Sequence, residues 1–247
     1  MVALSRKPAA PLSLPPAYRL LALREREDAH DHACRIAEEA GAGTFVWVGR
    51  FDVIEFAVVL EPSEPLASAR RAVFAGMGAM ADALAAFGPP EKAVTFTFPA
   101  TVHFDGGRLG GGRLAWPAEC LEAEVPRWLV FSGMLLASPV GGIDPGHHPG
   151  ATWLEEEGFD PRDFPEVVAS FARHLMLAFD AWSERGFKAV ADTYLARLPR
   201  EGGPGRRGID ANGDLLLHHD GRAERMPLLP GLAEAAWLDP GTGAPRL

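Results

Sequence analysis

The feature that most constrains this chain is a glycine-rich stretch between apolar runs, HFDGGRLGGGRLAW at residues 103–116. Glycine lacks a Cβ atom, so it turns freely and lets another group approach the backbone closely. The stretch therefore predicts two strands around a glycine-rich turn, either as a plain hairpin with a bulge or as backbone shaped for a ligand. Arg108 lies among these glycines and offers a planar, permanent charge to a carboxylate or phosphate.

Apolar runs elsewhere predict the rest of a sheet. Runs rich in β-branched and aromatic residues, separated by turn residues, are typical of strands. Short turns between neighbouring runs favour antiparallel pairing. The predicted strands begin with a short run after residue 17, continue with a hairpin at 44–50 and 52–62, and end with runs at 93–99, 101–116 and 127–138.

Four stretches predict helices that pack on this sheet. One ends near Gly41, and another carries Val73, Met77, Met80 and Leu84 at helical spacing as a core stripe that stops before Gly88. Two more follow at 163–186 and 187–198. The fold class expected is therefore α+β, with a mixed, largely antiparallel sheet.

Changes in composition divide the chain into an expected arm, two domains and a linker. Residues 1–16 are proline-rich and predict an extended arm, and residues 17–200 carry the main domain. Residues 201–208 are rich in glycine and charge, which is typical of a linker. Residues 209–247 contain Asn-Gly and Asp-Gly turns between strand-like runs, so we expect a small β domain there.

Charge and composition exclude several classes of protein. The net charge of −9 argues against a nucleic-acid binder, which normally carries a basic face. The two cysteines, Cys34 and Cys120, cannot form a disulfide framework and fit a reducing compartment. No apolar run approaches the roughly 18 residues of a spanning helix, and the start is too proline-rich for a secretory signal. We expect a cytoplasmic protein with no membrane partner.

Two other motifs have competing interpretations. In DAHDHAC, Asp28 and His32 share a helix face, as do His30 and Cys34, which is typical of metal ligands. No third partner is nearby, so the pattern favours an acidic helix N-terminus and no metal site. The GPGRRG segment at 203–208 could cradle a phosphate, but no strand and helix flank it, which favours the linker.

The order of elements, together with several motifs, resembles the biotin and lipoate protein ligase family. REDAHDHACRIAEEAGAGTFVWVGR lies where that family has its first helix and strand. TFTFPATVHFDGGRLGGG corresponds to its Trp-Pro-Asn strand and lysine-bearing hairpin, with Phe98-Pro99 for Trp-Pro, Arg108 for the lysine and Gly111 on the family glycine. WLVFSGMLLA resembles the next core strand, and the C-terminal β unit resembles the SH3-like module of biotin ligases.

The resemblance implies a two-step reaction and a set of site residues. ATP, with magnesium, would adenylate biotin, lipoate or a medium-chain acid such as octanoate, and the acyl group would pass to a lysine of a biotinyl or lipoyl carrier domain. Arg108 is the implied catalytic residue, because it could neutralise charge on the acid and phosphates. The implied contacts to the bound acid or nucleotide are His30, Arg50, Phe98, His103, Gly110, Gly111, Gly112 and Gly133.

Departures from the family leave three alternatives. The arginine-rich glycine loop that covers the adenylate is reduced to WVGRFDVIEF, with Arg50 as its only basic residue, and Ala100 replaces the family asparagine. The chain is therefore expected to be a divergent ligase, a non-catalytic binder of the acid or its adenylate, or a protein-interaction scaffold. The sequence leaves the choice of acid and the oligomeric state open.

Overall fold

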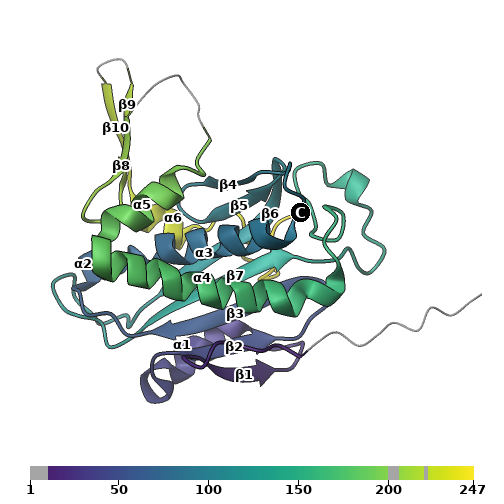
Figure 1. Ribbon diagram of the computed structural model, residues 1–247, viewed down its shortest axis with the longest axis horizontal. Helices are drawn as coiled ribbons and strands as arrows, with labels where there is room; N and C mark the ends of the chain where they lie inside the picture. The colour runs from purple at the N-terminus through teal and green to yellow at the C-terminus, as the bar shows by residue number, and fades with distance from the viewer. Residues whose placement is uncertain (1–10, 200–205, 220–221) are drawn as a thin grey trace, which may run out of the picture.

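The computed structural model describes residues 11–199, 206–219 and 222–247, and its main body is a seven-stranded sheet in the order β1-β2-β3-β7-β6-β5-β4 (Figure 1). All neighbouring strands pair antiparallel except β1 and β2, which are parallel. The expected α+β class and the expected β2–β3 hairpin are confirmed. The strands are Arg19–Leu23, Thr44–Val48, Val53–Leu60, Val94–Thr97, Thr101–Phe104, Gly107–Ala115 and Leu129–Leu136, numbered β1 to β7.

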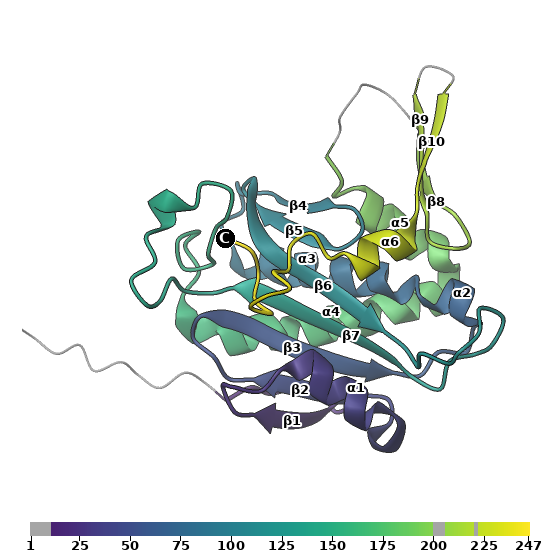
Figure 2. The ribbon, with the colours of Figure 1, turned by 180° about the vertical axis from the view of Figure 1, so that it is seen from behind.

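Helices cover both faces of the sheet. The long helices α3 (Ala72–Phe87) and α4 (Phe164–Arg185) pack side by side on one face, and α5 (Phe187–Leu195) joins them. Helix α1 (Ala29–Ala40) packs on the opposite face against β2, β3 and β7 (Figure 2). A single turn of helix, α2 (Leu66–Ala69), precedes α3. No helix in the described ranges is both long enough and apolar enough to cross a bilayer.

The core explains the apolar runs. Every residue of β7 is buried, because α3 and α4 cover one of its faces and α1 contacts the other. The expected stripe of α3 is confirmed as core, since Val73, Met77, Met80 and Leu84 are each exposed by at most 1%. The strand predicted as central therefore lies at the centre of the sheet.

A β-bulge in the glycine-rich hairpin decides which way Arg108 points. Thr101 pairs with Gly111, and His103 pairs with Arg108, so Leu109 is an extra residue on β6. Without this bulge, Arg108 and Gly111 would alternate to opposite faces. With the bulge, both residues lie on the face opposite α3, while Leu109 turns into the core. The turn itself is Asp105-Gly106, and Gly110 to Gly112 lie inside the strand.

The C-terminal part forms a separate three-stranded sheet and then returns to the main body. Strands β8 (Arg206–Ile209), β9 (Leu215–His219) and β10 (Arg222–Met226) pair in the order β10-β9-β8. The small C-terminal β unit is thereby confirmed. Its first strand begins within the expected linker, and residues 200–205, which include the start of GPGRRG, lie outside the described residues, as do residues 1–10 of the expected arm. After α6 (Leu228–Ala233) the chain runs back along β6 (Figure 2).

Gly133 lets β7 approach the helices, so we expect Gly133→Ala to destabilise the fold. A Cβ atom there would lie 2.5 Å from Cζ of Phe56 and 3.2 Å from Cε of Met80. Overpacking of this kind costs about 1–3 kcal/mol. Urea unfolding measures the change, and Gly208→Ala is the matched control, since no heavy atom lies within 4 Å of its added Cβ. Equal stability of the two variants would contradict this account of Gly133.

Candidate functional site

The candidate site is a cluster of polar side chains on the sheet face that α1 covers. Asp28 is the N-cap of α1, and its carboxylate accepts a hydrogen bond from the Asp31 backbone N–H at 2.8 Å. Such a cap starts the helix, because it satisfies an N–H group that has no partner within the helix. The cap holds the first turn of α1 above β3 and β7, where the helix makes contacts with both strands.

Glu55 of β3 is the buried acid of this cluster. Its side chain is 3% exposed, and Oε1 accepts a hydrogen bond from the Ala29 backbone N–H at 2.6 Å. Oε2 lies 3.4 Å from Nη1 of Arg50, whose guanidinium also pairs with Asp52 at 2.6 Å. Burial raises the pKa of Glu55, although the Ala29 N–H and Arg50 oppose the rise. The positive end of α1 and Arg50 together hold this carboxylate under the helix.

His30 and Ser132 form a close pair on the same face. Nδ1 of His30 lies 2.8 Å from Oγ of Ser132, which is 4% exposed on β7. Burial, together with the nearby charge of Arg113, lowers the pKa of His30 to about 4. His30 is therefore neutral at pH 7 and can exchange a hydrogen bond with the hydroxyl in either direction.

Arg113 of β6 supplies the cluster with a hydrogen-bond donor that has no partner. Its Nη2 lies 3.5 Å from both carboxylate oxygens of Asp28, which is a long contact. Its Nε is buried and is the one such side-chain atom without a hydrogen-bond partner among the described residues. Ser132 is its direct neighbour across the β6–β7 ladder. A buried donor of this kind is costly unless a ligand or water satisfies it.

The C-terminal segment covers the next part of β6. Trp237 is 1% exposed, and its indole N–H donates to the Gly112 carbonyl at 3.3 Å. A Cβ atom on Gly111 would lie 2.4 Å from the indole, so only glycine permits this contact. The guanidinium of Arg108 donates from Nε and Nη2 to the Arg246 carbonyl at 3.2 and 3.1 Å. The structure thus gives Arg108 a partner within the chain.

Four of the nine residues predicted from the sequence lie in two groups. His30 and Arg50 lie in the polar cluster, and Arg108 and Gly111 lie under the C-terminal segment. The remaining five lie elsewhere in the packing. Gly112 and Gly133 face the α3 side, Gly110 adjoins the Met134 carbonyl, Phe98 stacks on Phe74 at 6.2 Å, and His103 Nε2 lies 3.0 Å from Thr97 Oγ1.

Three residues of the cluster were missed by sequence reasoning. Glu55 was a single acid inside the apolar run VIEFAVVL, and Ser132 was a single hydroxyl inside WLVFSGMLL. Isolated polar residues in otherwise buried strands are informative, because each requires a partner. Arg113 lay in the glycine-rich stretch itself, but only the strand register shows that it faces α1 rather than α3.

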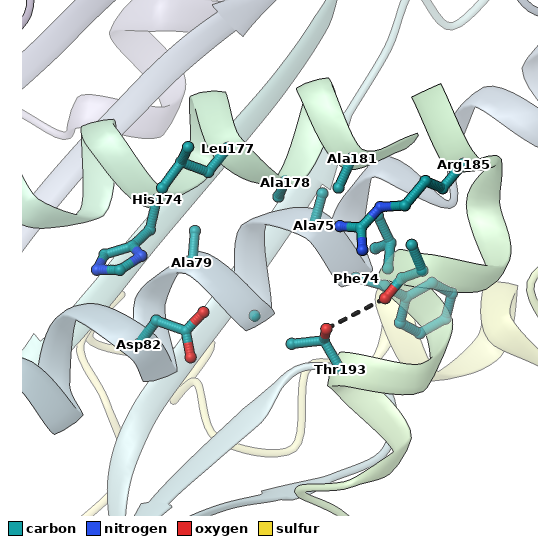
Figure 3. Close-up of a pocket in the computed structure, with 13 residues that line it drawn as sticks. Phe74, Ala75, Ala79, Asp82, His174, Leu177, Ala178, Ala181, Arg185 and Thr193 are labelled. Atoms are coloured by element: carbon teal, nitrogen blue, oxygen red, sulfur yellow. Dashed lines mark hydrogen bonds between the residues drawn. The ribbon is translucent and has the colours of Figure 1, made fainter. Parts of the chain in front are cut away.

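Hollows also lie outside the cluster, and one of them, of about 400 Å³, is lined by Val59, Leu60 and Trp182 among others. Two more differ in their place on the sheet. One, of about 770 Å³, is open and is lined by residues 23–27 and Gly49, directly before Asp28 and Arg50 in the chain. The other, of about 200 Å³, lies on the opposite side of the sheet between α3, α4 and α5, where Asp82, His174 and Arg185 surround small side chains (Figure 3). Within the described residues, no three His, Cys, Asp or Glu side chains are arranged to hold a metal ion.

A sheet of this order, with α1 capped over a polar floor, defines a protein of the biotin-ligase fold, and comparison with known proteins agrees. A protein of unknown function that is described as biotin protein ligase-like, from Silicibacter sp. TM1040, is 28% identical, with a TM-score of 0.76 over 90% of this chain and 99% of that one. A point mutant of the biotin protein ligase of Aquifex aeolicus, in complex with biotin, has a TM-score of 0.63 at 15% identity, over 86% and 96% of the two chains. No curated protein matches the sequence.

The model of the biotin/lipoate A/B protein ligase family matches residues 14–196. The chain belongs to that family, which confirms the resemblance in its sequence. The match ends before β8, so it includes the whole seven-stranded sheet and leaves out the C-terminal segment that carries Trp237.

The lowered pKa of His30 predicts a loss of stability in acid. Its pKa is about 4 in the folded chain, below the usual 6.5, so the unfolded chain binds the proton first as pH falls from 6.5 to 4. We expect His30 to account for a loss of about 2 kcal/mol in unfolding free energy between pH 7 and pH 5. In urea unfolding, His30→Asn should not show this loss of unfolding free energy between pH 7 and pH 5. The matched control, His32→Asn, should show the same loss as the natural chain. Identical pH profiles for His30→Asn and the natural chain would refute the assignment.

Proposed function

We propose that this chain binds a small carboxylic acid on the sheet face beneath α1 and acts as a divergent acyl–protein ligase. Biotin, lipoate and medium-chain acids such as octanoate are the candidate acids. In the proposed reaction ATP, with Mg²⁺, adenylates the carboxylate with release of pyrophosphate. The acyl group then passes to a lysine of a biotinyl or lipoyl carrier domain in the cytoplasm, with release of AMP. Solved structures of the fold support the nucleotide part, since the enzyme from Aquifex aeolicus has been seen in complex with biotin and ATP.

The observation that carries the binding proposal is the unpaired Nε of Arg113. A guanidinium with a free, buried N–H is suited to a carboxylate oxygen, and a charge-assisted bond there is stronger than a neutral one. Ser132 and the neutral His30 lie beside it and can orient the second oxygen. The existing pair with Asp28 is long, at 3.5 Å, so it leaves Arg113 able to turn toward a ligand.

The arrangement of basic groups suggests where a nucleotide would lie. The open hollow beside Asp28 contains Arg24 and Arg26, whose guanidinium groups are suited to phosphate oxygens. Arg50 adjoins this hollow through Gly49, but Asp52 and Glu55 hold its guanidinium. Arg108 remains the proposed electrostatic residue for the transfer step, which requires its release from the Arg246 carbonyl.

A second function, binding without catalysis, is favoured by a specific observation. Both arginines that the family pattern identifies are occupied: Arg108 by the Arg246 carbonyl, and Arg50 by Asp52 and Glu55. Only four residues connect β2 to β3, which leaves no length for a loop over an adenylate. A chain with these features could retain the acid or its adenylate and leave the chemistry to another protein.

The deciding experiment supplies ATP, Mg²⁺ and an apo carrier domain with biotin, lipoate or octanoate in turn. Intact-mass analysis of the carrier and measurement of AMP report transfer and activation. We expect acylated carrier with one acid, and a loss of transfer in Arg108→Ala. If an acid binds but yields neither AMP nor acylated carrier, the ligase proposal is wrong and the chain is a non-catalytic binder of that acid.

Arg113 is tested separately by ligand affinity. We expect Arg113→Ala to weaken binding of the acid at least about tenfold, because a hydrogen bond to a charged group contributes roughly 1.5–3 kcal/mol. The matched control is Arg127→Ala, since Arg127 is an exposed arginine that pairs only with surface acids, Glu38 and Glu119. Isothermal titration calorimetry makes the comparison. Unchanged affinity in Arg113→Ala would place the acid elsewhere on the molecule.

A further inference from the structure

The hollow of about 400 Å³ lies beside α4, at the end of β3, and the proposed function does not use it. Hollows that take small molecules usually measure about 300–1,000 Å³ and are mainly apolar, with a few polar groups. This one, the α4 hollow, has that character. Its apolar lining comes from β3, β7, α2, α3 and α4 and includes Leu60, Ala69, Ala72, Leu129, Phe179 and Trp182.

The apolar side of the α4 hollow consists of a buried floor and aromatic rings. Ala69, Ala72 and Leu129 form the floor and are exposed by at most 4%, so they belong to the core and are held by its packing. Phe179 and Trp182 come from successive turns of α4, and their rings stack with centroids 6.2 Å apart. These residues together offer a fixed apolar surface to an alkyl or aryl group.

The charge at the rim of the α4 hollow is negative. Among the described residues, its lining includes two acids, Glu61 and Glu64, and no basic side chain. Glu64 is neutralised by Arg71, whose Nη2 lies 2.8 Å from Oε2 of Glu64. Glu61 has no ion pair in the described ranges, and its Oε1 accepts a hydrogen bond from the Ala42 backbone N–H at 3.1 Å. Its second carboxylate oxygen can therefore pair with a ligand that carries a positive charge.

We propose that the α4 hollow binds a small organic amine, with the ammonium group at Glu61 and the apolar body against Phe179 and the buried floor. The carboxylate of Glu61 attracts a cation, gives an uncharged ligand no ion pair and repels an anion. The proposal goes beyond the proposed function and does not rest on it. Six residues of nearly extended chain, roughly 20 Å, separate Glu61 from Glu55 of the polar cluster.

Two ligands of one shape test the role of charge: 4-phenylbutylamine, which is a cation at pH 7, and the uncharged 4-phenylbutanol. Ligand-observed NMR titration measures the affinity of each. The natural chain should bind the amine about two- to fivefold more tightly than the alcohol, because an exposed ion pair contributes little. Glu61→Gln keeps an oxygen for the Ala42 N–H and removes the charge, so the amine should lose this advantage. Glu156→Gln, an exposed acid outside the hollow, is the matched control and should keep it.

A variant that fills the α4 hollow tests the location. Ser183 lines the hollow from an exposed position of α4, so Ser183→Trp places a large ring there without replacing a core residue. The affinity for 4-phenylbutylamine should fall at least about tenfold, because the apolar body of the amine loses its contact surface. Glu184→Trp is the matched control, since Glu184 is the next residue of the same helix, is also exposed and does not line the hollow.

The outcomes separate this proposal from the proposed function. Unchanged amine affinity in Ser183→Trp, or no measurable binding to the natural chain, overturns the site. Equal affinity of the natural chain for the amine and the alcohol, or an undiminished advantage of the amine in Glu61→Gln, overturns the role of Glu61. Binding of biotin, lipoate or octanoate beneath α1 should be the same in Ser183→Trp and the natural chain. Circular dichroism establishes folding, and if Ser183→Trp is unfolded, Ser183→Leu makes the same comparison with a smaller side chain.

Discussion

The rest of the structure depends on one constraint: helix α3 and the C-terminal segment both pack closely against the glycine-rich strand β6, one on each face. On one side of β6, Gly112 leaves room for Met77 of α3 and for Phe131. On the other side, Gly111 accepts the indole of Trp237 at a distance that no Cβ atom would permit. Because both layers lie directly on the backbone, β6 is covered on both faces over these residues. The ends of β6, at Arg108 and Arg113, are where it carries charge.

The polar cluster is held by the first turn of α1. The Ala29 N–H donates to Glu55, and Asp28 both caps the helix and faces Arg113. Burial keeps His30 neutral and raises the pKa of Glu55, so the cluster combines charged and uncharged groups in a small volume. Polar groups placed this deep are stable only when their partners are fixed, and the cap of α1 fixes most of them. The remaining donor, Nε of Arg113, is where a ligand has most to contribute.

The chain keeps the fold of the ligase family but departs from its sequence pattern at a few places. The family match includes the whole sheet and α1, and α1 packs over the polar face of β2, β3 and β7. Two departures from the family pattern are plain in the structure: only four residues connect β2 to β3, and Arg108 donates to the backbone carbonyl of Arg246. Under the proposed function, acid binding and nucleotide chemistry use different elements of the fold, so one can change without the other.

The sequence by itself determined the order of strands and helices along the chain, the core stripe of α3 and the buried position of β7. These follow from local apolar periodicity. It also placed His30 and Arg50 among the candidate site residues. Only the tertiary structure decided that Glu55, Arg113 and Ser132 meet beneath α1, since they come from three strands whose pairing has no local signal. It likewise decided the partner of Arg108, because the bulge at Leu109 sets its face and the returning C-terminal segment brings the Arg246 carbonyl to it across 138 residues.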